Sequence, residues 1–205
     1  IRDQLIILVD ATGSIGSTNY FNNEKALVQA FTEAMPDGTY ESGIDSFAGV
    51  KTTQWLKMPL APFDRGRMVD GASSLKPLGS LTPLARAIRH QEAEFKARDG
   101  RAALLVYSDG KVRDPNDVLQ ACKELKAAHT GELCIYTVQV GDSDSGSKLL
   151  QDMAAVNGCG KFYDGASLHS AAAIDAMVRD IFLGPKEIKK CAPPAVAWKL
   201  HIIYF

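Results

Sequence analysis

The sequence predicts an α/β domain built on a doubly wound, mostly parallel central sheet with helices on both faces. Short apolar runs, typical of strands, alternate along the chain with longer segments in which apolar residues recur at helical spacing. The runs over 4–9 and 102–108 are almost continuously apolar, as expected for strands covered on both faces. One helix between successive strands then favours parallel pairing through crossover connections.

The N-terminal half contains three expected strands and three expected helices. The expected elements are a strand over 4–9, a helix over 20–35, strands over 40–47 and 51–58, a short helix over 63–74 and a helix over 82–96. Pro36 follows the first long helix and ends it, because proline cannot continue a helix. Gly49-Val50 predicts a hairpin turn between the second and third strands.

The C-terminal half continues the alternation. The expected elements are a strand over 102–108, a helix over 114–128, a strand over 133–140, a helix over 147–156, a short strand over 160–165 and a helix over 169–182. Asp114 is a good N-cap, with Pro115 at the first helical position. We therefore expect one domain over 1–184. The proline- and lysine-containing segment 185–205 lacks periodicity, and we expect a strap or linker that leads to a further domain.

The composition is that of an ordinary water-soluble domain and excludes some classes of protein. The 205 residues are 46% hydrophobic and 23% charged, with a net charge of −1. This balance gives no electrostatic footprint for nucleic acid. No apolar run approaches the roughly 18–20 residues that span a bilayer.

Oxygen-bearing side chains follow the two most continuous strands. Asp10 and Asp109 each stand at the carboxyl end of an expected central strand, the edge at which ligands bind in open α/β sheets. A buried carboxylate needs a partner, and a divalent cation would serve both. Thr12, Ser14 and Thr82 add hydroxyl oxygens, which makes an all-oxygen set suited to Mg²⁺ or Mn²⁺ rather than zinc. Each hydroxyl also has a simpler interpretation: Thr82 as a helix N-cap, and the other two as turn residues.

The segments "LVDATGSIGS", "SLTPLARAI" and "VYSDG", in this order and spacing, resemble a von Willebrand factor A domain with a metal-ion-dependent adhesion site. The resemblance covers about residues 3–183. The first motif of that family is Asp-x-Ser-x-Ser, and here it is Asp10-Ala11-Thr12-Gly13-Ser14. The resemblance implies that Thr12 and Ser14 ligate the metal directly while Asp10 holds coordinated waters. Thr82 matches the loop threonine of the family, and Asp109 matches its final aspartate.

The chain departs from the family pattern at Thr12, where serine is usual. Threonine keeps the hydroxyl, but its β-methyl group restricts χ1 and adds bulk that affects affinity or geometry. The implied ion is Mg²⁺ or Mn²⁺, and Ca²⁺ also fits an oxygen site. We interpret Asp45, Asp64 and Asp70 as solvated surface residues rather than further ligands.

The resemblance implies protein recognition and no enzymatic activity. In this family a partner protein's acidic side chain completes the shell of the metal. One alternative is a structural scaffold whose metal site has degenerated. Another is a haloacid-dehalogenase-like phosphatase, which is disfavoured because its general acid/base aspartate would fall at Thr12. The sequence contains no G-x-G-x-x-G, P-loop or G-x-S-x-G motif.

Four cysteines can form two disulfides or remain as buried free thiols, and the choice between these bears on the compartment. In the expected sheet, Cys134 begins one strand and Cys159 precedes the next, so a disulfide between them at the amino ends is reasonable. Cys122 and Cys191 would form a second bridge that fixes the tail. Disulfides indicate an oxidising compartment. The region 133–160 is similar to bacterial cell-envelope members of the family, and "HIIYF" resembles the opening strand of OmpA-like peptidoglycan-binding domains. We therefore expect an exported, periplasmic or outer-membrane-associated protein.

Overall fold

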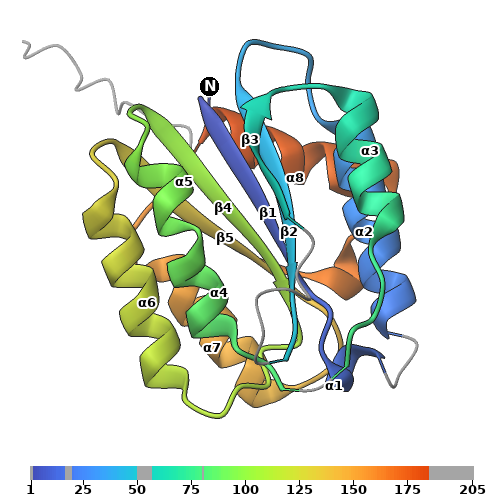
Figure 1. The fold of residues 1–205 in the computed structure, drawn as a ribbon. Coiled ribbons are helices and arrows are strands. Elements are labelled where there is room, and N and C mark those ends of the chain that lie inside the picture. Colours follow the sequence, from blue (N-terminus) through green and yellow to red (C-terminus); the bar gives the residue numbers. More distant parts are fainter. Residues whose placement is uncertain (1, 17–19, 50–56, 80, 185–205) are drawn as a thin grey trace, which may run out of the picture.

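A six-stranded sheet forms the centre of the molecule (Figure 1). The computed structural model describes residues 2–16, 20–49, 57–79 and 81–184. The strands are β1 (Gln4–Asp10), β2 (Glu41–Phe47), β3 (Lys57–Pro62), β4 (Arg101–Ser108), β5 (Glu132–Gln139) and β6 (Phe162–Asp164). Their order is β3-β2-β1-β4-β5-β6, and every neighbouring pair is parallel except β2 and β3. The predicted doubly wound, mostly parallel sheet is confirmed.

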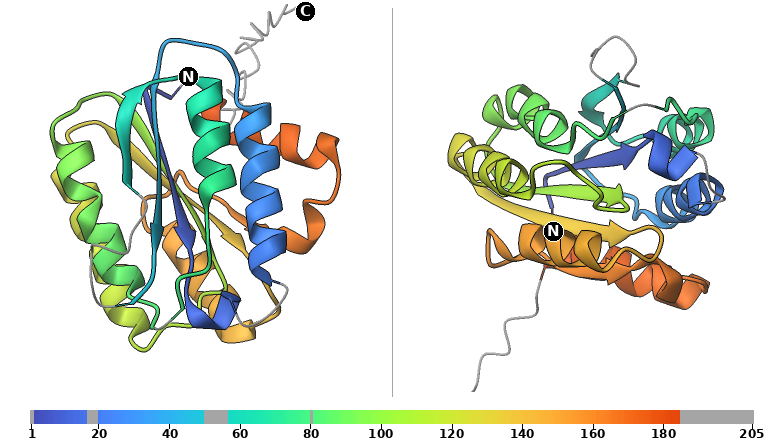
Figure 2. Two further views of the ribbon diagram at one scale, coloured as in Figure 1. Left: turned by 45° about the vertical axis from the view of Figure 1, so that its right-hand side comes forward. Right: turned by 90° about the horizontal axis from the view of Figure 1, so that it is seen from below.

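Helices cover both faces of this sheet (Figures 1 and 2). The helices are α1 (Gly13–Gly16), α2 (Tyr20–Ala34), α3 (Arg65–Ser74), α4 (Leu84–His90), α5 (Glu92–Lys96), α6 (Pro115–Ala128), α7 (Asp144–Ala155) and α8 (Ala171–Leu183), with a short 3₁₀ turn over Gly165–Ser167. Helices α2, α3 and α8 pack on one face, and α4 to α7 pack on the other. None of the described helices is long and apolar enough to cross a membrane.

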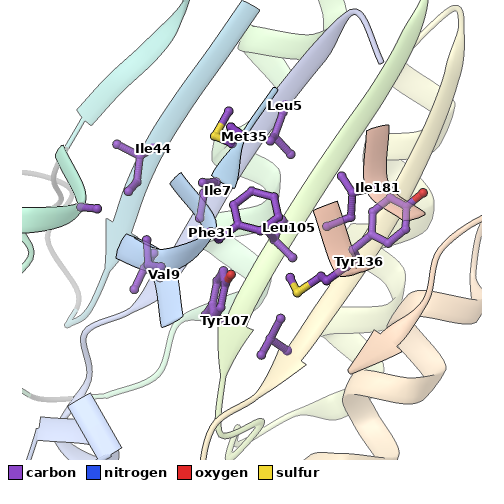
Figure 3. Close-up of a cluster of buried hydrophobic side chains, with 14 of the residues drawn as sticks. Leu5, Ile7, Val9, Phe31, Met35, Ile44, Leu105, Tyr107, Tyr136 and Ile181 are labelled. Carbon is purple, nitrogen blue, oxygen red and sulfur yellow. The ribbon is translucent and has the colours of Figure 1, made fainter. Parts of the chain in front are cut away.

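Side chains alternate between the two faces along the buried central strands. Every residue of β1 is buried, as are all those of β4 after its first residue. The odd-numbered apolar residues of β1 face α2 and α8, and Figure 3 shows Leu5, Ile7 and Val9 in that cluster together with Phe31 of α2 and Ile181 of α8. The even-numbered ones face α4 to α7. The near-continuous apolar runs in the sequence are explained by this burial on both sides.

Two expected elements of the N-terminal half were wrong in detail. Strand β3 spans 57–62 rather than 51–58, and residues 50–56, including the expected turn at Val50, lie outside the described part. The helix expected over 82–96 is divided at Gln91, whose side-chain amide donates to Asp45 Oδ2 (3.1 Å) and to the Ala87 carbonyl (3.3 Å). Asp45 was expected at the surface, but it is buried in β2 against this amide.

Cys134 and Cys159 lie at the opposite edge of the sheet from Asp10. A disulfide joins Cys134 at the start of β5 to Cys159 before β6, as the topology predicted. Cys122 is a free cysteine on the buried side of α6, so the expected second bridge is not formed at that residue. Its expected partner Cys191 lies outside the described residues, as does the whole segment 185–205.

Candidate metal centre

The carboxyl ends of β1 and β4, which are neighbours in the sheet, bring the two candidate aspartates to one edge. Asp10 is the last residue of β1, and Asp109 directly follows β4. Both carboxylates are buried, with 0% and 1% of the residue exposed. Helix α1 begins three residues after Asp10, at this same edge (Figures 1 and 2).

The three candidate hydroxyls form a connected chain. Thr82 Oγ1 donates to Thr12 Oγ1 at 3.2 Å, and the oxygens of Thr12 and Ser14 are 3.4 Å apart. The N-cap of α4 is Pro83, and no described side chain caps this helix. Thr82 therefore does not serve as an N-cap. Its hydroxyl donates instead to Thr12, which lies 70 residues earlier in the sequence, in the turn after β1.

Asp10 is held by hydrogen bonds at both oxygens. Oδ1 accepts from the Thr12 amide (3.0 Å) and Oδ2 accepts from the Ser108 hydroxyl (2.6 Å). Burial raises the pKa of Asp10 to about 6, and the nearby charge of Asp109 adds to this rise, against the lowering effect of the hydrogen bonds. Ser108 was not recognised in the sequence. It also accepts from the Gly110 amide (3.0 Å), so it ties Asp10 to the turn that carries Asp109.

Asp109 has one satisfied oxygen and one unsatisfied oxygen. Oδ1 accepts from the Lys111 amide (2.9 Å), while the buried Oδ2 has no hydrogen-bond partner among the described residues. The nearest charge of opposite sign is the ammonium group of Lys111, at 4.0 Å from Oδ2. A carboxylate oxygen in this condition is costly to bury, and a bound cation removes that cost.

The backbone around Asp109 is fixed by close contact with the first turn of α7. Gly110 has φ +69°, which favours glycine, and a Cβ added there would lie 2.6 Å from Gly146. A Cβ added at Gly146 would lie 1.9 Å from the Asp109 carbonyl oxygen. Two glycines thus allow α7 to pack directly on the turn and hold Asp109 in place.

A third buried carboxyl group lies beside the pair and was missed in the sequence. Glu24 is fully buried on α2, and neither of its oxygens has a hydrogen-bond partner in the described part of the chain. Burial raises its pKa well above the usual value, and the charges of Asp10 and Asp109 raise it further. The signal for this residue was its position within the apolar stripe of α2, between Phe21 and Val28.

These residues fit a divalent cation bound mainly through hydroxyls. Across the described ranges, no group of three or more His, Cys, Asp or Glu side chains is arranged to hold a metal. The candidate site instead offers the linked hydroxyls of Thr12, Ser14 and Thr82, with Asp10 and Asp109 behind them. Asp109 Oδ2, which is buried and has no hydrogen-bond partner among the described residues, is the atom that a bound cation would most directly satisfy.

A cavity away from the candidate metal residues has a mostly apolar lining. It measures about 570 Å³ and lies between α2 and residues 139–142 and 165–169, with mostly apolar walls. Its only carboxylate, Asp142, accepts a hydrogen bond from the Tyr20 hydroxyl (3.2 Å). This cavity therefore offers no cluster of oxygen ligands for a cation.

Residues 4–183 match the family model of the von Willebrand factor type A domain. The match covers most of the chain, and the chain therefore belongs to this family. The resemblance drawn from the sequence motifs is confirmed. No curated protein matches the chain in sequence.

Solved structures show the same fold at low sequence identity. An aerotolerance-related membrane protein from Bacteroides fragilis is 16% identical, with TM-score 0.66 over 86% of this chain and 98% of that one. The vWF domain of the type V pili tip protein Mfa5 from Porphyromonas gingivalis is 11% identical, with TM-score 0.69 over 89% and 96%. Proximal thread matrix protein 1 from the mussel byssus, whose MIDAS motif is occupied by zinc, is 18% identical, with TM-score 0.60 over 88% of this chain and 47% of that one.

Proposed function

We propose that this domain is a metal-dependent protein-recognition module. Its divalent cation, Mg²⁺ or Mn²⁺, is held by Thr12, Ser14 and Thr82 with Asp10 and Asp109 behind them, and an acidic side chain of a partner protein completes the shell. The observation that carries the proposal is the buried, unpartnered Oδ2 of Asp109 beside the linked hydroxyls.

The charge balance of the site supports recognition of a carboxylate. Two of the five proposed metal-holding side chains are acidic and balance the charge of one divalent cation. The ammonium group of Lys111, 4.0 Å from Asp109 Oδ2, then leaves the site with a net positive charge that attracts a further anion. The hydroxyl chain faces a cavity of about 340 Å³ lined by Ser14 and Thr82, which gives a partner side chain access. The metal's role is electrostatic: it holds the partner carboxylate in the place that the site provides.

The other hypotheses from the sequence fit less well. A scaffold with a degenerate metal site has no need of a buried, unsatisfied carboxylate oxygen, which destabilises the fold. A phosphatase of the haloacid-dehalogenase type needs an ionisable general acid near its nucleophile. The side chain two residues after Asp10 is Thr12, whose hydroxyl is bonded within the chain of three.

The structural neighbours favour an exported domain of a bacterial envelope. Two of them are an aerotolerance-related membrane protein and a pilus tip protein. The disulfide between Cys134 and Cys159 is consistent with an oxidising compartment. Binding to peptidoglycan through an OmpA-like domain after residue 200 stays a prediction, because residues 185–205 lie outside the described part.

Calorimetric titration of Mg²⁺ and Mn²⁺ into chelator-treated protein tests the metal site. We expect saturable binding of one ion by the wild type and loss of that binding in Asp109→Ala. Asp70→Ala is the matched control, because Asp70 is an exposed carboxylate on α3 and its removal should leave binding unchanged. Absence of binding in the wild type up to several millimolar ion would favour the scaffold instead.

A further inference from the structure

Two cationic side chains border the cavity in front of the hydroxyl chain. Lys111 and Arg113 line it together with Ser14 and Thr82. Lys111 is near Asp109, as described above, whereas Arg113 is exposed and forms no ion pair with any described residue. An unpaired guanidinium beside a cation site is an additional anchor for an anion, and its planar fork suits a carboxylate.

Two exposed leucines flank this cavity in sequence, and one of them lines it. Leu81, which lines the cavity, is 55% exposed, and Leu78 in the same loop is 39% exposed. Among the described residues only one other large apolar side chain, Leu183 at the end of α8, is comparably exposed. Apolar side chains exposed together beside a polar site are typical of a binding surface.

The loop that carries the two leucines is fixed to the sheet. The amides of Leu78 and Gly79 donate to the Ala11 carbonyl (2.8 and 3.1 Å), and the Leu81 carbonyl accepts from the Gly49 amide (3.0 Å). These bonds attach the loop to the segments that follow β1 and β2. The leucines are therefore held in place before a partner binds, which lowers the entropic cost of binding.

We propose that the partner segment carries two acidic side chains and an aliphatic one between or beside them. This inference rests on the proposed function: the first carboxylate completes the metal shell. The second carboxylate pairs with Arg113, and the aliphatic side chain packs on Leu81 and Leu78. The surface thus selects among acidic proteins, since a single carboxylate uses only one of its three features.

Defined peptides in saturating Mn²⁺ test this inference. The probes are acetylated, fluorescently labelled peptides in which an Asp and a Glu are separated by one to three residues that include a Leu. Matched peptides replace the Asp by Asn, the Glu by Gln, or the Leu by Ser. Fluorescence anisotropy measures Kd for the wild type and for the variants Arg113→Gln and Leu81→Ser, with Arg179→Gln on α8 as a control far from the site.

We expect the Asp-Leu-Glu peptides to bind best and to lose binding in chelator. Replacing one of the two acids should weaken binding to the wild type by about two- to fivefold, the range of an exposed ion pair. That loss should disappear in Arg113→Gln and persist in Arg179→Gln. Leu81→Ser should remove the preference for Leu over Ser in the peptide.

The metal titration distinguishes failure of this inference from failure of the proposed function. If Mn²⁺ binds to wild type and Arg113→Gln alike but the peptides bind equally with one acid or two, the inference is overturned and the proposed function stands. The same holds if inorganic phosphate displaces the peptides at equal concentration. If none of the peptides binds to the metal-loaded protein, the inference and the carboxylate recognition of the proposed function are both overturned, and only the metal site stands. If Mn²⁺ itself does not bind, the proposed function fails first and the inference fails with it.

Discussion

At the amino-terminal edge of the sheet each nitrogen of the buried Arg2 guanidinium has a partner, whereas at the carboxyl-terminal edge the buried carboxyl groups of Asp109 and Glu24 have oxygens without a hydrogen-bond partner. The Arg2 guanidinium donates to the Ile181 carbonyl (2.9 Å), to Glu132 Oε1 (2.5 Å), and to Cys134 Sγ and the Tyr136 hydroxyl (both 2.9 Å). Asp109 Oδ2 and both Glu24 oxygens have no such partner within the described ranges.

The difference predicts which edge serves stability and which serves binding. Burial of a charge is tolerated when hydrogen bonds and an opposite charge replace water, as they do around Arg2. The disulfide lies at this same edge and also restrains it. At the other edge the unsatisfied oxygens of two buried carboxyl groups reduce the stability of the metal-free fold. A cation bound beside Asp109 would stabilise the folded state by mass action.

The largest expected effect is at the amino-terminal edge. Arg2→Ala removes the buried guanidinium. It leaves the Ile181 carbonyl without this donor and the Tyr136 hydroxyl with only its 3.4 Å bond to the Asp180 carbonyl, so we expect a loss of about 3 kcal/mol in the free energy of unfolding. Urea denaturation measures this loss, with Arg179→Ala as a surface control. Affinity for Mn²⁺ should not change. A comparable loss of metal binding would mean that the two edges are not independent.

The stability of the metal-free protein should fall as pH rises through the range in which Asp10 ionises. Its folded-state pKa of about 6 lies above the ordinary value of 3.8, so its contribution is fully present below pH 3.8 and is lost as pH rises through 6. The shift corresponds to at most about 3 kcal/mol. Urea midpoints in chelator from pH 4 to 7 measure the wild type against Asp10→Asn, which lacks the ionisation.

Addition of Mg²⁺ or Mn²⁺ should reverse this loss at pH 7. The ion favours the ionised carboxylate, so the difference in stability between metal-loaded and metal-free wild type should grow with pH and be small at pH 4. Identical pH profiles for wild type and Asp10→Asn would contradict the assignment of this carboxylate.

Gly146→Ala should disturb the turn that carries Asp109. The new Cβ would meet the Asp109 carbonyl oxygen at 1.9 Å, so the first turn of α7 must move away. Overpacking of this kind costs about 1–3 kcal/mol, and we expect affinity for Mn²⁺ to fall as well. Thermal unfolding and metal titration measure the two effects. Ser147→Ala at the next position is the control, and equal behaviour of the two variants would show that this contact does not position the site.

The fold and the candidate ligands were predictable because their signals are local. A continuous apolar run marks a strand buried on both faces, and β1 and β4 are found at the expected places. Asp114 caps α6 as predicted, since its carboxylate accepts from the amides of Asn116 and Asp117. The five candidate metal residues are carried by three short motifs, which define the family without any knowledge of packing.

The features that the sequence did not predict depend on contacts between distant parts of the chain. The break at Gln91 and the burial of Asp45 are one feature, because the amide of the first donates to the carboxylate of the second across 46 residues. In the sequence, Glu24 is an acidic residue within the apolar stripe of an expected helix. Its place beside Asp10 becomes visible only when α2 packs on the sheet. Ser108 stands within the segment "VYSDG", but its function as hydrogen-bond donor to Asp10 depends on the pairing of β4 with β1.

The smallest expected effect concerns Lys111, whose ammonium group lies 4.0 Å from the unpartnered oxygen of Asp109. In the metal-free protein this partly exposed side chain supplies the nearest positive charge, and it repels an incoming cation. Lys111→Met should therefore raise affinity for Mg²⁺, by no more than about fivefold, because an exposed pair contributes under about 1 kcal/mol. Calorimetry at low ionic strength measures the change, and 0.5 M salt should reduce it. Lys123→Met on the exposed side of α6 is the control. A fall in affinity would mean that Lys111 supports the metal-bound state and would contradict the expected repulsion between its ammonium group and the cation.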